Sequence, residues 1–237
     1  LAAGADDVLP RPVDDLVLLA RLRSLLRARD AEAELALRDD TRRALGLAES
    51  PAQFETPLQV LVVGAGSGRE TDAALAHALR KRLRGRIHVM RPEEALRHAP
   101  PNPDAIVVIE NTGATSGGLD LLPQMRASEA TRHAALIYVA HPHQRREAAS
   151  ALDIGASDLI TQGPEIEELI LRITKQARRK RLGDRLRANM RDGLRAAVTD
   201  PLTGLYNRRY ALPHFDRLAE HARERGRPFA VLLADID

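Results

Sequence analysis

Five short runs of apolar residues, separated by stretches with helical spacing, are the feature that most limits how this 237-residue chain can fold. Each run is continuous rather than alternating, which is typical of strands that are covered by helices on both faces of a parallel sheet. The order, strand then helix five times, predicts a doubly wound α/β domain from Leu58 to about Arg178. The runs are Leu58–Val63, Ile87–Met90, Ala105–Ile109, Ala135–Ala140 and Asp158–Thr161.

An internal repeat relates the start of the chain to the end of this α/β region. The segment Gly4–Leu9, with the sequence GADDVL, recurs as Gly155–Ile160, with the sequence GASDLI, 151 residues later. Each copy reads as a short strand, a polar turn and an amphipathic helix. Because nothing precedes the first copy here, we expect a strand around Val8 and Leu9 without a sheet, and a helix from about Asp14 to Leu37 that lacks most of a core. The same offset pairs Leu18 with Leu169, Leu19 with Ile170 and Leu22 with Ile173.

The segments on either side of the α/β region have simpler patterns. Residues 46–56 include Pro51 and read as a linker. A helical pattern runs from Glu165 to about Val198, and we expect its second part, residues 179–199, to be a stalk helix able to pair with a second copy. The proposed seam consists of Leu182, Leu186, Met190 and Leu194.

Composition excludes several classes of protein. Hydrophobic residues make up 44% of the chain and charged residues 29%, which excludes wholesale disorder. The net charge is only +3 and aromatic residues are 3%, so a nucleic-acid-binding surface is not expected. No apolar run reaches the roughly 20 residues needed to cross a bilayer, and the first residues lack a signal-peptide pattern, so no membrane insertion is expected. The absence of cysteine fits a cytoplasmic protein.

The α/β region, ending in Gly155-Ala156-Ser157-Asp158 before the last strand, resembles the receiver domain of two-component signalling, which has a flavodoxin-like fold. The first copy, through Pro12, resembles the end of a receiver more closely, and Arg11 lies where the family has a lysine that contacts the phosphoryl group. The resemblance implies a histidine kinase or phosphotransfer protein as partner. Arginine keeps the charge of lysine but changes its geometry.

The complete second copy departs from the receiver pattern at every position that phosphorylation requires. Gly64 and Ala65 stand where the family has magnesium-binding acids, and Glu110 stands at the phospho-acceptor position. Ala140 replaces the hydroxyl residue, and Gln162 replaces the lysine. We therefore expect a folded adaptor that cannot be phosphorylated and that supports dimerisation.

The segment Thr199–Tyr210, with the sequence TDPLTGLYNRRY, resembles the start of an α+β GGDEF domain, and the likeness continues through a helix from Arg208 to Arg225 and a strand from Phe229 to Asp237. By this resemblance Asp235 and the Ile236 carbonyl would bind Mg²⁺, and Leu202 would lie near the guanine of GTP. A hard cation such as Mg²⁺ prefers oxygen ligands. The signature hairpin and the inhibitory Arg-x-x-Asp site are not present in these residues.

Together the three likenesses resemble response-regulator diguanylate cyclases of the PleD type. They imply condensation of two GTP molecules into cyclic di-GMP by a homodimer, in a phosphorelay, for the complete protein. On this basis the chain divides into residues 1–45, the end of a first receiver; 46–56, a linker; 57–178, the degenerate adaptor; 179–199, the stalk helix; and 200–237, the start of the GGDEF domain. These residues alone are expected to be inactive.

Alternative interpretations remain open. The parent protein could instead be a non-catalytic cyclic di-GMP receptor or scaffold. The glycine-rich stretch Gly64–Gly68 follows a strand, as in dinucleotide-binding loops, but Met90-Arg91-Pro92 lacks the acid expected after the second strand. His141-Pro142-His143 lacks a third metal ligand at suitable spacing and reads as a loop. The basic run Arg178–Arg181 reads as a solvated helix face or a site for cyclic di-GMP phosphates.

Overall fold

The computed structural model describes residues 7, 9, 14–44, 56–64, 69–110, 117–141, 143–161 and 165–232. The chain forms two compact units, Leu1–Asp184 and Arg185–Asp237.

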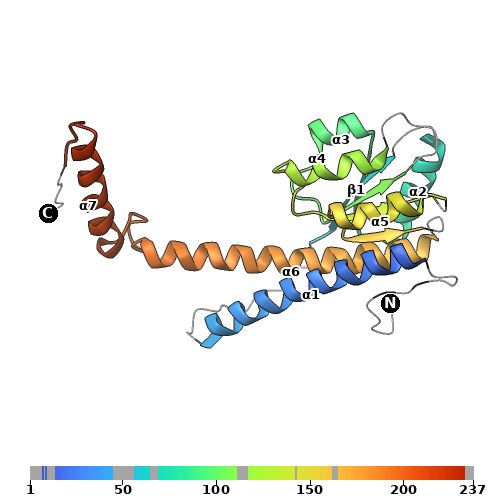
Figure 1. Ribbon diagram of the computed structural model, residues 1–237, viewed down its shortest axis with the longest axis horizontal. Coiled ribbons are helices and arrows are strands. Elements are labelled where there is room, and N and C mark those ends of the chain that lie inside the picture. Colours follow the sequence, from blue (N-terminus) through green and yellow to red (C-terminus); the bar gives the residue numbers. More distant parts are fainter. Residues whose placement is uncertain are drawn as a thin grey trace. The chain divides into compact units, whose positions relative to one another are not determined.

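All five predicted strands are present, and they form one parallel sheet in the order β2-β1-β3-β4-β5 (Figure 1). This order is that of the flavodoxin-like doubly wound fold, to which receiver domains belong. The predicted fold class is therefore confirmed for this region. The strands are β1 (Leu58–Gly64), β2 (Gly85–Met90), β3 (Ala105–Ile109), β4 (Ala135–Val139) and β5 (Asp158–Ile160).

Helices connect the strands and cover both faces of the sheet. The connecting helices are α2 (Arg69–Arg82), α3 (Pro92–His98), α4 (Leu121–Ala127), which follows the 3₁₀ turn η1 (Gly118–Asp120), and α5 (Arg145–Ile154). After β5 the chain continues into α6 (Ile166–Val198), a single helix close to the predicted bounds. Within the described ranges, no helix is both long enough and apolar enough to pass through a membrane.

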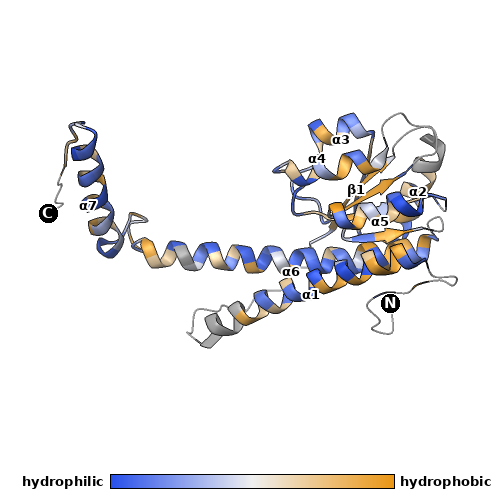
Figure 2. Cartoon of the chain, in the orientation of Figure 1, coloured by the Kyte–Doolittle hydropathy of each residue, from blue (hydrophilic) through white to orange (hydrophobic). Residues whose placement is uncertain are grey.

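Successive residues of the strands point alternately into two hydrophobic cores. Leu61, Val63 and Ile106 belong to the core on the side of α3, α4 and α5. Val60 and Val107 face the opposite core, together with side chains from α2 and α6. Figure 2 shows that the central strands are hydrophobic along their length, as expected when both faces are covered. Each fully buried Val, Leu or Ile side chain stabilises the fold by about 1.5–3 kcal/mol.

The helix of the first repeat copy, α1 (Asp15–Ala44), packs against α5 of the second copy (Figure 1). As expected, this helix lacks most of a core, since Leu16, Leu19, Leu22 and Leu26 are exposed, although Val17 and Ala20 are buried in the core on the α5 side. The opposite face of α1 remains exposed. The predicted strand around Val8 and Leu9 is not formed at Leu9, since no described strand lies beside it to complete its hydrogen bonds, and Val8 lies outside the described residues.

In the smaller unit, the last part of α6 leads into a turn and then into α7 (Arg208–Glu224). This helix matches the predicted helix from Arg208 to Arg225. Asn207 caps it, since its side-chain oxygen accepts a hydrogen bond from the Tyr210 amide at 3.0 Å. The predicted strand that begins at Phe229 is not formed over residues 229–232. These residues are exposed and have no neighbouring strand in the described part of the chain, and a lone strand cannot satisfy its backbone groups.

Candidate functional site

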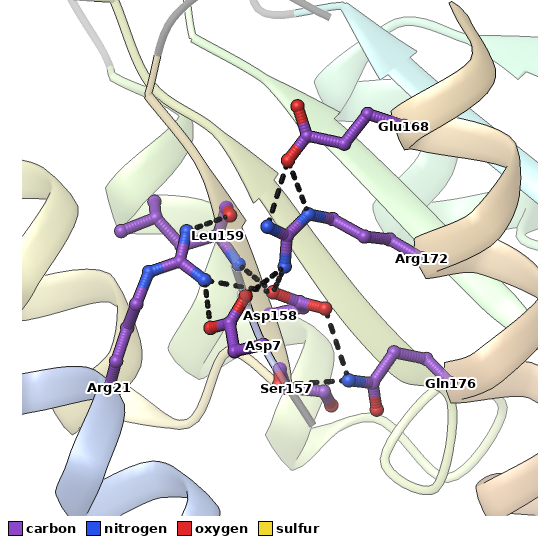
Figure 3. A network of polar contacts seen from close by, with 8 residues as sticks. All are labelled: Asp7, Arg21, Ser157, Asp158, Leu159, Glu168, Arg172 and Gln176. Carbon is purple, nitrogen blue, oxygen red and sulfur yellow. Dashed lines mark hydrogen bonds and ion pairs between the residues drawn. The ribbon is translucent and has the colours of Figure 1, made fainter. Parts of the chain in front are cut away.

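Four charged side chains from the two repeat copies meet where α1 lies against β5 and α6 (Figure 3). One guanidinium nitrogen of Arg172 lies 2.6 Å from Asp158 and 3.0 Å from Asp7. Arg21 forms an ion pair with Asp7, and its guanidinium lies 3.6 Å from Asp158. Each arginine therefore contacts both aspartates, so the ion pairs cross between the copies.

The crossed ion pairs are buried, and further hydrogen bonds complete their coordination. Arg172 is 1% exposed, and its Nε donates to Glu168 at 2.8 Å. Gln176 donates to the second oxygen of Asp158 at 3.2 Å, and Arg21 donates to the carbonyl of Leu159. Burial acts to lower the pKa of Arg172, but the carboxylates of Asp158, Asp7 and Glu168 outweigh it and raise the pKa. The carboxylates around it thus favour the charged form of Arg172.

The network follows the repeat. Asp7 and Asp158 are 151 residues apart, and so are Arg21 and Arg172. The aspartates were found as equivalent residues of the repeat, whereas the two arginines were not, although the same offset relates them. The two copies differ beside the arginines, because the second copy has Glu168 where the first copy has Val17. As a result, Nε of Arg21 is buried and has no acceptor within the described residues, whereas Nε of Arg172 is bound by Glu168.

A second buried carboxylate attaches α6 to the central strand of the sheet. Asp104, which immediately precedes β3, is 6% exposed and accepts two hydrogen bonds from Arg181, at 2.8 and 2.7 Å. It also accepts the Gln59 amide of β1 at 2.8 Å. Bidentate arginine–carboxylate pairs are strong and directional. Arg172 and Arg181 thus attach α6 to the sheet at two points nine residues apart.

The basic run Arg178–Arg181 is used largely within the molecule. Arg179 forms an ion pair with Glu32 of α1, and Lys180 lies 2.7 Å from Asp184. Arg181 binds Asp104. The interpretation of this run as a solvated face is therefore wrong for three of the four residues, because Glu32 and Asp104 come from distant segments and Asp184 from the next turn of the same helix.

Three of the five positions at which the α/β region departs from the receiver pattern lie at one edge of the sheet. Gly64, Glu110 and Ala140 end or follow β1, β3 and β4, so they lie at the same edge of the parallel sheet. Gly64 and Ala140 are buried and offer neither a carboxylate nor a hydroxyl group. Ala65 and Gln162 lie outside the described residues, as does most of the stretch Gly64–Gly68.

Glu110, at the phospho-acceptor position, is half-buried and forms a hydrogen bond within the fold. Its carboxylate accepts a hydrogen bond from the hydroxyl of Tyr138, a residue of β4 that is fully buried. A Cβ atom added at Gly117 or Gly118 would lie 3.1 or 3.0 Å from the Glu110 carboxylate, so these glycines allow the η1 turn to approach it. Burial and the bond to Glu110 raise the pKa of Tyr138. The side chain thus has a packing role in the structure.

His141 and His143 follow β4 at this edge of the sheet. The rings of His141 and His143 are 5.3 Å apart. Among the residues that the structure describes, no group of three or more His, Cys, Asp or Glu side chains is arranged to bind a metal. The predicted Mg²⁺ ligands Asp235 and Ile236 and the phosphate-contact residue Arg11 lie outside that part of the chain.

In the smaller unit, Asp200 organises the turn that contains Leu202. The Asp200 carboxylate accepts hydrogen bonds from the Leu202 and Thr203 amides at 3.1 and 2.9 Å and from the Thr203 hydroxyl at 3.0 Å. Hydrogen bonds from Thr203 lower the pKa of Asp200. Gly204 follows with φ of 69°, a conformation that favours glycine. Leu202 is 94% exposed on this turn.

The turn adjoins a pocket of about 640 Å³ between the end of α6 and the start of α7. Its lining includes Arg195, Leu205, Tyr206 and Tyr210. The rings of Tyr206 and Tyr210 have their centres 4.7 Å apart.

Comparisons with known proteins agree with this arrangement. Residues 197–237, which begin at the end of α6, match the family described as diguanylate cyclase, GGDEF domain. The whole chain is 33% identical over 239 aligned residues to the response regulator PleD of two Caulobacter vibrioides strains, NA1000 and ATCC 19089. This chain matches a PleD-type response regulator along its entire length. It spans 52% of the length of those PleD proteins.

Solved structures of receiver domains are also similar to the PleD-like α/β region. One is the receiver domain of a histidine kinase from Syntrophus aciditrophicus, with 19% identity, a TM-score of 0.43, and coverage of 50% of this chain and 89% of that one. Another is the chemotaxis response regulator CheY4 of Vibrio cholerae, with 13% identity, a TM-score of 0.43, and coverage of 50% and 98%. The strand order, rather than these similarities, identifies the fold.

Proposed function

We propose that the chain is part of a cytoplasmic response regulator whose output is a diguanylate cyclase, which condenses two GTP molecules into cyclic di-GMP. The observation that carries this proposal is the match of residues 197–237 to the GGDEF family at the end of a helix that begins in a receiver-like domain. The similarity to PleD over the whole chain supports the same order of domains.

The domain boundaries proposed are residues 1–45, 46–56, 57–178, 179–199 and 200–237. Support for the first domain, residues 1–45, comes from a comparison of the two repeat copies. Leu22 and Leu26 are 47% and 58% exposed on α1, whereas their counterparts at the 151-residue offset, Ile173 and Ala177, are fully buried on α6. The exposed face of α1 is thus equivalent to the face of α6 that packs against the sheet. A first receiver sheet is the partner that would bury this face.

In the complete protein, Arg11 would contact the phosphoryl group of the first receiver, supplied by a histidine kinase or a phosphotransfer protein. The second receiver would serve as an adaptor, since Gly64 and Ala140 provide none of the groups that aspartyl phosphorylation requires. The stalk, residues 179–199, would bring two GGDEF domains together in a homodimer, because each supplies one GTP to the reaction.

Within residues 200–237, Asp235 and the Ile236 carbonyl would hold Mg²⁺, and Leu202 would lie near the guanine. A carboxylate and a carbonyl oxygen have the donor chemistry that Mg²⁺ prefers. When bound, the ion would neutralise charge on the GTP phosphates. The exposed position of Leu202 leaves its side chain available for contact with a nucleotide.

The test is cyclic di-GMP formation by the complete protein, purified and supplied with GTP and Mg²⁺, with product measured by chromatography. We expect product from the wild type and a loss of at least about a hundredfold in Asp235→Asn, since metal-bound charge stabilisation contributes several kcal/mol. Asp216→Asn, on the surface of α7, is the matched control. We expect no turnover from residues 1–237 alone. A complete protein that binds cyclic di-GMP but never forms it would instead be a receptor or scaffold.

A further inference from the structure

Helix α6 connects the adaptor to the GGDEF region, and its position is set by buried charges. Arg172 and Arg181 bind the buried carboxylates Asp158 and Asp104, and both carboxylates belong to or adjoin strands of the sheet. The first repeat copy reaches this set at two points, since Arg21 lies 3.6 Å from Asp158 and Asp7 lies 3.0 Å from Arg172. Asp7 is therefore the carboxylate of the first copy that directly contacts Arg172.

Arg172 has little freedom to follow a movement of Asp7. Its Nε and one Nη bind Glu168, both at 2.8 Å, and its other Nη binds Asp158 at 2.6 Å, so the guanidinium is fixed in the frame of β5 and α6. The Arg172 side chain is 1% exposed and that of Asp7 12% exposed. A buried ion pair is sensitive to separation, because water cannot screen the charges or replace the lost contact.

Asp7 is also closely linked along the chain to the phosphate-contact position of the first copy. It precedes Arg11 by four residues. Arg21, one of the two arginines that bind Asp7, lies on the first copy's own helix α1. A displacement of the segment around Arg11 would therefore move the Asp7 carboxylate relative to Arg172, and the crossed ion pairs would resist or transmit that movement.

We propose that the Asp7–Arg172 ion pair couples the state of the first receiver to helix α6, with Arg172 acting as a positioning residue for the output domain. This inference rests on the proposed function, because it concerns regulation of the same cyclase. The exposed pair Arg23–Asp153, which also joins α1 to α5, has no such role. The side chains of Arg23 and Asp153 are 57% and 47% exposed, and neither residue belongs to α6.

The experiment measures the cyclase rate of the complete protein with and without beryllofluoride as the phosphoryl mimic. We expect Asp7→Asn to keep the basal rate close to wild type but to lower the activation factor by at least about fivefold, the lower end of typical coupling between sites. Asp7→Glu should restore most of the activation. Asp153→Asn, the matched control, should leave activation unchanged.

A double-mutant cycle separates coupling from general weakening of the junction. If the signal passes through this pair, Asp7→Asn combined with Arg172→Gln reduces activation no further than Arg172→Gln alone. Wild-type activation in Asp7→Asn, or two losses that multiply in the double variant, would overturn the proposal.

A second measurement keeps the two proposals distinguishable. Hydrogen exchange of the first turns of α6 should change on addition of beryllofluoride in the wild type and not in Asp7→Asn. If the wild type forms no cyclic di-GMP but shows this exchange response, the cyclase assignment fails and the coupling stands. If it forms cyclic di-GMP and the α6 amides respond equally in both proteins, the coupling fails and the cyclase assignment stands.

Discussion

Arg21 and Arg172 occupy equivalent positions in two repeat copies, 151 residues apart, and each contacts both Asp7 and Asp158. An arginine and an aspartate thus pair within each copy, and the same four residues also pair between the copies. This relationship makes the junction between α1 and the adaptor polar and specific at its centre, while Val17 and Ala20 add apolar contact beside it.

Removing one arginine from this junction should destabilise the fold. Arg172→Met leaves Asp158 buried with its charge poorly compensated, so we expect the free energy of unfolding to fall by about 3–5 kcal/mol, as for other broken buried ion pairs. Urea denaturation followed by circular dichroism measures this change. Arg23→Met, which removes the exposed pair with Asp153, should cost less than about 1 kcal/mol. Equal losses in the two variants would contradict the importance of burial.

The exposed face of α1 gives a test of the first receiver. In residues 1–237, Leu22→Ala should change the free energy of unfolding by no more than about 0.5 kcal/mol, because the side chain is 47% exposed. In a longer protein that contains the rest of a first receiver, the same change should cost about 2–5 kcal/mol, as in a core. Ile173→Ala, at the equivalent and fully buried position of α6, should be costly in both proteins. A neutral Leu22→Ala in the longer protein would argue against the proposed domain.

The bond between Tyr138 and Glu110 should contribute to stability. Tyr138→Phe removes the donor to a half-buried carboxylate, and we expect a loss of about 1.5–3 kcal/mol near neutral pH. Because the folded pKa of Tyr138 is raised above its ordinary value of 10.0, this contribution is fully present below pH 10 and decreases as the pH rises further. Denaturation of both proteins between pH 7 and 11 measures the trend. Tyr206→Phe, on a residue 62% exposed, should show no such difference.

The Asp200 turn should depend on pH in the opposite sense. Its folded pKa is lowered below the ordinary value of 3.8, so its contribution to the turn is present above pH 3.8 and is lost as the pH falls through the lower folded value. Carbon-detected NMR titration of the carboxyl group measures the folded pKa. Thr203→Val removes the hydroxyl donor and should move the pKa back toward 3.8, whereas Thr203→Ser should not. An unchanged pKa in Thr203→Val would show that the backbone amides alone cause the shift.

The local pattern of the sequence determined the elements of the larger unit. Continuous apolar runs such as Leu58–Val63 predicted strands covered on both faces, and the strand order in the structure agrees with the doubly wound fold. The helical pattern of the sequence likewise predicted the long helix α6, and the GGDEF resemblance implied helix α7. The strand expected from Phe229 was not found in residues 229–232, because a strand depends on a neighbour that the local pattern cannot supply.

Only the tertiary structure decided which charges pair and which faces are buried. The sequence placed Asp7 and Asp158 in equivalent positions, but their shared contacts with Arg21 and Arg172 depend on bringing α1 against β5 and α6. The same holds for Arg179 with Glu32 and for Tyr138 with Glu110. Periodicity records the environment of a residue along its own helix or strand, whereas an ion pair or hydrogen bond between distant segments is fixed by packing. For this reason the repeat could be found from sequence, and the network that joins its two copies could not.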